Sequence, residues 1–273
     1  MGLWTTLAAI AVLATASLTP GAAISALRST DPGALVAVGS EHGAGGLVPL
    51  LTGGDSREVT RAAIEASAGA DDGWLTLVPL AALAAGPDRS LAAPAAFSAE
   101  RIARAFDRDR MLELDVPDEA ARAALAAWRS LGATADRWAD VRVHALEVTT
   151  HLHAALGADA GPDDAPYDLD ALIADADPEV RRAALELLPQ PIPTGAIPKA
   201  AAILRGDTDP IVAIVAAQVL CAGLAFDDEP TAILAAIDSA GMTRLAALIV
   251  DSAMPPGAIA DAKRCVAAGG DTK

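Results

Sequence analysis

A short phrase that recurs along the chain constrains the fold more than any other feature of the sequence. Its clearest copy, Asp177–Leu188, is an Asp-Pro pair followed by a valine, two arginines and two alanines. Asp accepts hydrogen bonds from free amides at a helix N-cap, and Pro suits the first helical position, so the pair predicts a helix start. Val180, Ala184 and Leu187 then fall on one face of that helix.

Copies of this phrase predict a chain of helix pairs. A shorter apolar segment, such as 169–174 or 197–204, precedes a copy. Helix pairs that repeat every 30 to 40 residues or so are typical of an α-solenoid. The composition agrees, because alanine, the best helix former, is abundant and only 3% of residues are aromatic. We therefore expect an all-α fold with further copies at 58–65, 141–148 and 209–220 and a looser one at 241–244.

The phrase formed by Asp175, Asp177-Pro178, Val180-Arg181, Ala184 and Leu187 resembles the second helix of HEAT repeats. The resemblance implies a ladder between neighbouring repeats, made by an Asp in the turn and an Arg six residues later. Asp175 with Arg181 and Asp136 with Arg142 match this spacing. Ala213 stands where the arginine after Asp207 would be, so we expect the ladder to stop there. In the copy at 58–65, Gly54 and Thr60 also depart from the pattern.

The chain is expected to form one continuous solenoid with loose joints. We assign residues 1–23 to a signal peptide, 24–115 to degenerate helical repeats, and 116–273 to HEAT-like repeats that end in a capping helix at 256–268. Residues 70–115 look irregular, with Ser98 expected to cap a short charged helix, and 157–166 is a predicted linker.

The first residues predict export. Residues 2–27 carry no charged side chain, and small residues follow an apolar core, as in a secretory signal. We expect a periplasmic or secreted bacterial protein. An uncleaved anchor and a buried first helix of a cytoplasmic protein are the alternatives, and the oligomeric state is open.

The net charge of −16 excludes nucleic acid as a partner, because its binders need clustered Lys and Arg. The sequence has no nucleophile elbow, Walker loop or Cys-x-x-Cys motif. We therefore expect a non-enzymatic scaffold without a cofactor that binds a protein or peptide, and the acidic balance favours a basic one. HEAT-like folds also host DNA glycosylases and phycobilin lyases, so an enzyme or small-ligand-binding protein of lyase type is the alternative.

The predicted binding surface is an acidic column on the second helices. In HEAT solenoids these helices line the concave surface, so the resemblance implies a partner-binding role for the residues that share one helical phase. The alternative is that glutamate occurs at these positions only because it is a good helix former on an exposed surface. The column consists of Glu65, Glu147, Glu186 and Gln218.

Three other groups of side chains have structural interpretations. Asp140, His144, Glu147 and His151 share one helix face and could ligate a metal, but we expect a solvated polar stripe and no metal. Trp74, Trp128 and Trp138 could mark a pocket but are expected to fill the core. The arginines between 101 and 110 are expected to form a salt-bridged surface with Glu100, Asp107 and Asp109.

The two cysteines, Cys221 and Cys265, are predicted to form a disulfide. Export would expose them to oxidising conditions, and a bridge would staple the last repeat, which has no neighbour to cover it. Two buried thiols are the alternative. The pairing requires that the two Cα atoms lie within about 7 Å.

Overall fold

The computed structural model describes residues 18–29, 31, 33–54, 56–157, 167–189, 191–224, 231–250 and 255–270. All regular structure within these ranges is helical, which confirms the predicted all-α class. Residues 1–17 of the predicted signal peptide and residues 158–166 of the predicted linker lie outside the described residues.

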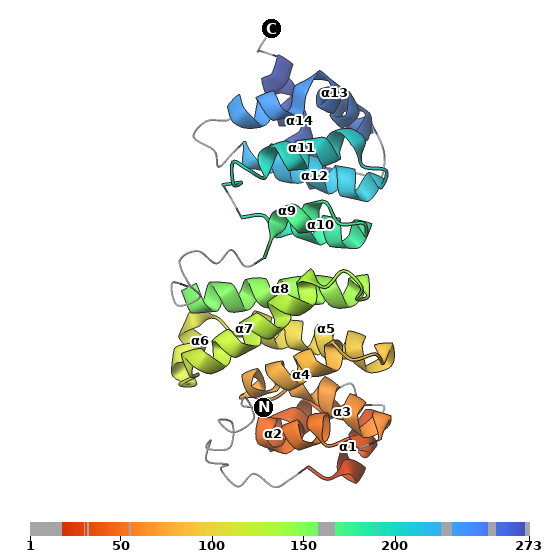
Figure 1. The fold of residues 1–273 in the computed structure, drawn as a ribbon, viewed down its shortest axis with the longest axis vertical. Coiled ribbons are helices and arrows are strands. Elements are labelled where there is room, and N and C mark those ends of the chain that lie inside the picture. The colour runs from red at the N-terminus through yellow and green to blue at the C-terminus, as the bar shows by residue number, and fades with distance from the viewer. Residues whose placement is uncertain are drawn as a thin grey trace. The chain divides into compact units, whose positions relative to one another are not determined.

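The chain divides into two compact units, Met1–Pro166 and Tyr167–Lys273. The expected joint at residue 115 therefore lies inside the first unit. In Figure 1 the helices of the first unit are α1 (Pro20–Leu27), α2 (Ala34–Thr52), α3 (Arg57–Ser67), η2 (Gly73–Thr76), α4 (Leu77–Ala84), α5 (Arg89–Ala105), α6 (Arg108–Glu113), α7 (Asp118–Ala133) and α8 (Ala139–Leu156). Those of the second are α9 (Leu169–Ile173), α10 (Pro178–Glu186), α11 (Ile197–Gly206), α12 (Pro210–Gly223), α13 (Thr231–Val250) and α14 (Pro256–Gly270).

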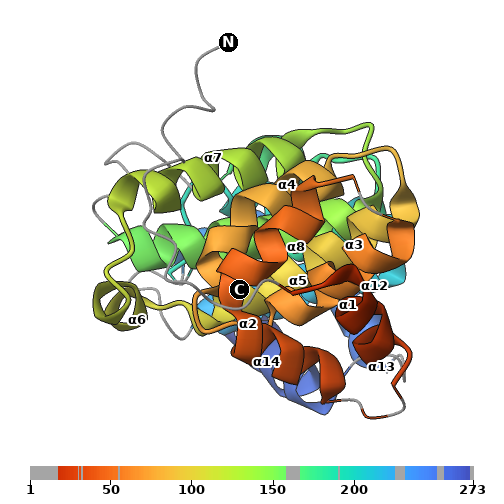
Figure 2. The same ribbon diagram turned by 90° about the horizontal axis from the view of Figure 1, so that it is seen from below.

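The first unit is a stack of helix pairs of the α-solenoid type. Helix α2 pairs with α3, α4 with α5, and α7 with α8. The second helices of the pairs pack side by side in the order α3, α5, α8, and the first helices contact one another in the order α2, α4, α7. Helix α1 packs on α2 and α3 at the end of the stack (Figure 2). The pairs thus form two layers, and we call α3, α5 and α8 the inner layer.

Helices α2 and α3 approach closely because two glycines lie at their contact. A Cβ atom on Gly39 would lie 2.1 Å from the carbonyl oxygen of Ala66, and one on Gly69 would lie 2.5 Å from that of Val36. Helix α2 also breaks at Gly43, whose φ of 60° favours glycine. Asp72 Oδ1 accepts the backbone N–H of Ala44 at 2.7 Å and so caps the second half of α2.

Residues 70–115 contain the regular helix pair α4 and α5, flanked by the 3-10 helix η2 and the short helix α6. Ser98 does not cap a helix: it is buried within α5 and donates to the carbonyl oxygen of Ile64 at 2.7 Å. The cap is Asp88, whose side chain accepts the N–H of Ser90. The prediction took Pro94 as the end of one helix and Ser98 as the start of the next, because proline usually ends a helix. In the structure Pro94 lies inside α5.

The second unit contains two further helix pairs and a modified third. Helix α9 pairs with α10, and α11 with α12, while α10 packs on α12 and α12 on α14. Helix α13 breaks at Asp238, where φ is 48°. Asp238 Oδ1 accepts the N–H of Gly241 at 2.9 Å and starts the half that holds the looser copy of the phrase. Helix α14 matches the predicted capping helix.

Two helices, α2 and α13, are long and apolar enough to span a membrane by length and composition. Each is broken by a residue with non-helical backbone angles, Gly43 in α2 and Asp238 in α13. Each therefore consists of two short helices rather than one continuous rod of spanning length.

Candidate functional site

The N-caps of the second helices give a common register for the candidate surface. The N-cap residues are Ser56, Asp88, Trp138, Asp177 and Asp209. The ninth residue after each cap is the corresponding member of the column. Four of these positions are the residues predicted from the sequence, and the fifth, on α5, was missed. In chain order the positions are Glu65, Phe97 and Glu147 in the first unit and Glu186 and Gln218 in the second.

Glu65 is held by an ion pair within its own helix. Arg61 Nε lies 2.9 Å from Glu65 Oε1, and the Arg61 side chain is the more exposed of the two, at 50% against 34%. Both residues line an open hollow between α3 and the start of α5, together with Leu27, Arg57, Glu58 and Ser90. The hollow therefore presents mixed charge rather than a row of free carboxylates.

Glu147 belongs to a polar network that joins α5 and α8. Arg104 lies 2.6 Å from Glu100 Oε1 and 3.8 Å from Glu147 Oε2. His151 Nε2 also lies 3.8 Å from Glu147 Oε2. Glu100 is buried despite its charge, so the pairing with Arg104 offsets the cost of removing its carboxylate from water. Arg104 is thus shared by two carboxylates.

The stripe on α8 is only partly solvated, with side chains that are 23–40% exposed. His144 is half-buried and contacts the Glu100 carboxylate through Nδ1. Asp140 pairs with Arg89 of α5 at 3.2 Å. The sequence did not reveal these contacts because the start of α5 was placed too late. Within the described ranges, no cluster of three His, Cys, Asp or Glu side chains could hold a metal ion.

Phe97 is the member of the column that sequence reasoning missed. Its side chain is 52% exposed, and its ring stands edge-on to the His144 imidazole with the centroids 5.5 Å apart. The signal that could have found it is its position nine residues after Asp88, once Asp88 is taken as the helix cap. An exposed aromatic ring therefore stands between Glu65 and Glu147 in the order of the helices.

In the second unit, Glu186 on α10 and Gln218 on α12 are both exposed at equivalent positions of two adjacent helices. A ladder rung joins the same two repeats. Arg181 donates from Nε and from an Nη atom to the two carboxylate oxygens of Asp207, each at 2.8 Å. Arg181 also donates to the backbone carbonyl of Asp175 at 2.8 Å, so the predicted spacing reflects a contact with the turn.

The ion pair between Arg181 and Asp207 shifts the pKa of each group so that its charged form is favoured. The hydrogen bond to Asp207 raises the pKa of Arg181 above its usual value. Burial opposes ionisation of Asp207, but the hydrogen bonds from Arg181 and from the N–H of Asp209 outweigh it and lower the pKa of Asp207. The pair is therefore charged across the neutral pH range.

The predicted ladder ends at Ala213, as expected, but an arginine on another helix makes a different contact with the next repeat. Arg205, at the end of α11, donates to Asp238 Oδ2 at 2.9 Å and to the carbonyl oxygen of Ala236 at 3.0 Å. The backbone N–H of Gly241 is the main cause that lowers the pKa of Asp238, and Arg205 adds to it. A cation from the first helix of the pair thus replaces the missing one from the second.

Cys221 on α12 and Cys265 on α14 lie at disulfide distance. Their Cα atoms are 5.4 Å apart, within the limit that the predicted pairing requires. Both side chains are buried, and 44 positions separate them in the sequence. The pair joins the last helix of the second unit to a helix of the clear repeat series.

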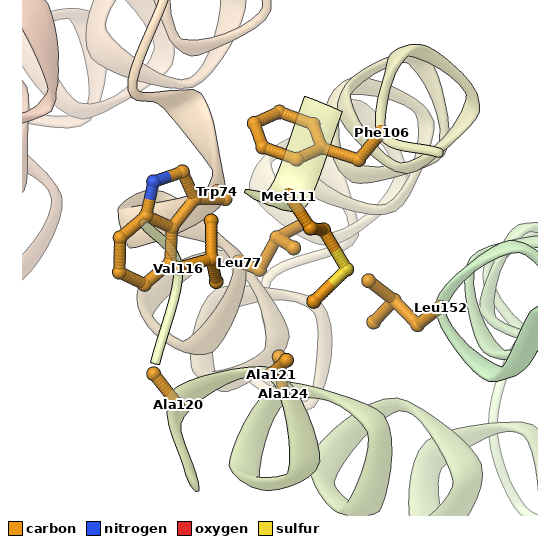
Figure 3. A pocket seen from close by; sticks show the side chains of 9 residues that line it. All are labelled: Trp74, Leu77, Phe106, Met111, Val116, Ala120, Ala121, Ala124 and Leu152. Carbon is orange, nitrogen blue, oxygen red and sulfur yellow. The ribbon is translucent and has the colours of Figure 1, made fainter. Parts of the chain in front are cut away.

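Of the three tryptophans expected in the core, Trp128 lies within it, while Trp74 and Trp138 are partly buried and pack against it. Trp128 is fully buried and donates from Nε1 to the carbonyl oxygen of Leu77 at 3.0 Å. Trp74, Phe106 and Met111 point towards a small apolar pocket that Leu152 closes from α8 (Figure 3). The pocket encloses about 10 Å³, the lower limit for one water molecule. It has no room for a small-molecule ligand in this conformation.

The negative charge of the chain does not lie on its helices. The fourteen α-helices contain 17 Lys and Arg against 15 Asp and Glu, whereas the remaining residues contain three against 21. Many of the aspartates cap helices, as Asp88, Asp107, Asp177 and Asp209 do. The described helices therefore carry a balance of charges, and the net negative charge of the sequence lies outside them.

Comparisons with known proteins give no family. No family model matches the chain, and no curated protein matches it. Among solved structures, the chain is similar to the designed armadillo repeat protein YIII(Dq)4CqI, at 19% identity and a TM-score of 0.39, over 92% of this chain and 99% of that one. The fold assignment accordingly rests on the helix pairs and their packing.

Proposed function

We propose that this chain is a non-catalytic helical repeat scaffold that binds a protein or peptide partner through the exposed face of the inner layer. The observation that carries the proposal is the row formed by Glu65, Phe97 and Glu147. These residues come from three helices that pack side by side and stand at the same distance from their caps. Stacked repeats present such rows as extended binding surfaces.

The polar network supports the same surface. Ion pairs on α3 and between α5 and α8 fix the side chains that border Phe97 before any partner arrives. A surface whose side chains are already ordered loses less conformational entropy on binding. The alternative, an enzyme or small-ligand-binding protein, would need a pocket with convergent polar groups. The pocket beside Trp74 is lined by apolar side chains and has a volume of about 10 Å³. The hollow lined by Arg61 and Glu65 has polar groups, but it is open rather than enclosed.

The proposal is tested by selecting binders from a random peptide library on the full chain. The strongest binder is then added to the chain, and backbone hydrogen exchange is compared with and without it. We expect slower exchange on α3, α5 and α8. Slower exchange confined to α2, α4 and α7, or the recovery of no specific binder, would reject this surface as the binding site.

The proposed location is the periplasm or the cell exterior, with the cytoplasm as the alternative. The charge-free segment at residues 2–27 and the cysteines at disulfide distance support an oxidising compartment. This part of the proposal is independent of the binding surface and has its own test below.

A further inference from the structure

The surface around Phe97 combines an exposed aromatic ring with arginines. Arg101 follows Phe97 by four residues and Arg104 by seven, so all three side chains lie on one face of α5. Aromatic side chains and arginines are the residues that most often dominate the energy of protein interfaces. We call Phe97, Arg101 and Arg104 the Phe97 patch.

The ring of Phe97 packs against a side chain of α8. The His144 imidazole stands edge-on to it, at an angle of 62° between the ring planes, and itself contacts Glu100. Half of the Phe97 side chain remains accessible to solvent. A partner can therefore bury the exposed part of the ring.

One arginine of the patch, Arg101, carries charge that no described carboxylate neutralises. Arg101 is exposed, and among the described residues no carboxylate is in ion-pair contact with it. It therefore departs from the salt-bridged surface expected from the sequence. Arg104 is 56% exposed and is shared between Glu100 and Glu147, whose side chains are 10% and 23% exposed. A partner meets the guanidinium groups before the carboxylates.

The inner layer as a whole agrees with this local balance. Helices α3, α5 and α8 contain six arginines and five carboxylates, in a chain with a net charge of −16. Of these helices, α5 contributes three arginines and one glutamate. With Arg142 and Glu100 buried, the layer that carries the predicted acidic column is nearly neutral, and Arg101 is the group in the Phe97 patch that favours a negative group in a partner.

We infer that the Phe97 patch binds a protein segment in which an apolar or aromatic side chain stands next to a carboxylate. The apolar side chain covers the Phe97 ring, and the carboxylate accepts hydrogen bonds from Arg101, whose planar guanidinium can bind both oxygens. This inference rests on the proposed function and names the chemistry of the partner. It differs from the basic partner that the acidic column predicts.

The test uses the full chain with its cysteine pair intact. Random peptides displayed on phage are selected on the wild-type chain, without counter-selection on any variant. The affinity of the best peptide is then measured by fluorescence polarisation with Phe97→Ser and Arg101→Ser. Val78→Ser on α4 and Arg122→Ser on α7 are the controls. Both residues are exposed, and both lie on first helices of the pairs, outside the inner layer.

The expected peptides place an apolar residue beside Asp or Glu. Phe97→Ser should weaken their binding about tenfold or more, and Arg101→Ser several-fold with a weaker dependence on salt. The control variants should bind as the wild type does. Basic peptides that depend on Glu65 and Glu147 but not on Phe97 would overturn this inference and leave the proposed function standing. Recovery of no specific peptide would reject both.

Discussion

Arg205 donates to Asp238 at 2.9 Å and so restores, from the end of α11, the contact between repeats that Ala213 cannot make. The two rungs of the second unit differ in burial. Arg181 and Asp207 have side chains that are 14% and 6% exposed, against 33% and 47% for Arg205 and Asp238. The same type of ion pair should therefore contribute differently to stability at the two positions.

We expect Asp207→Ala to lower the free energy of unfolding of the second unit by about 2–3 kcal/mol. The change leaves a mostly buried guanidinium without its carboxylate, although the carbonyl of Asp175 still accepts from it. Arg205→Ala, at the exposed rung, should cost less than about 1 kcal/mol. Urea unfolding followed by circular dichroism measures both. Equal costs at the two rungs would contradict the role assigned to burial.

The buried rung also predicts how stability depends on pH. The pKa of Asp207 is lowered in the folded chain, so its stabilising contribution is complete above the unfolded pKa of about 3.9. The contribution should be lost as the pH falls below that value and through the folded pKa. Asp207→Asn should show a shallower loss of stability over this acidic range than the wild type. A parallel loss in both proteins would show that other carboxylates dominate.

The pairing of Cys221 and Cys265 should stabilise the oxidised chain. Closing a loop over 44 positions contributes roughly 3–4 kcal/mol under the chain-entropy model. We expect reduced wild type and the Cys221→Ala, Cys265→Ala double variant to unfold at similar, lower urea concentrations than the oxidised wild type. Thiol titration of denatured, unreduced protein from an oxidising compartment should find no free thiol. Two free thiols would remove the bridge and weaken the proposal of export.

If the protein is exported, the first turn of α1 indicates where cleavage leaves the fold intact. Thr19 caps α1, and Leu18 and Ala23 are buried. Cleavage after Ala16 would keep these contacts, whereas cleavage after Ala23 would remove most of the helix. N-terminal sequencing of protein from the native host should therefore find Ser17 first. Intact Met1 or Gly2 in the cytosolic fraction would argue against export.

The repeats that carry strong local signals could be predicted from the sequence, and the pair between them could not. The Asp-Pro starts of α10 and α12 coincide with the predicted helix starts, because Asp177 and Asp209 cap those helices as expected. Helix α5 has Asp88 as its cap but Pro94 within it, and its core positions are mostly alanine. These residues give little contrast between its buried and exposed faces.

The error at α5 propagated into the candidate site. With the helix started at residue 99, Phe97 fell outside any helix, and His144 had no neighbour to pair with. Glu65 and Glu147 were placed correctly in phase, because their own helices begin near the expected residues. Their ion pairs depend on Arg61 and Arg104, and the second of these requires contacts between helices that a single sequence does not reveal.

The net negative charge outside the described helices has a consequence for the speed of association. A partner with a carboxylate is repelled at long range by the net charge of −16 and attracted only within contact distance of Arg101. Added salt screens the long-range repulsion over distances of about 10 Å, while a packed aromatic contact is little affected. Such a partner would therefore reach this surface faster as ionic strength rises, the reverse of ordinary electrostatic steering.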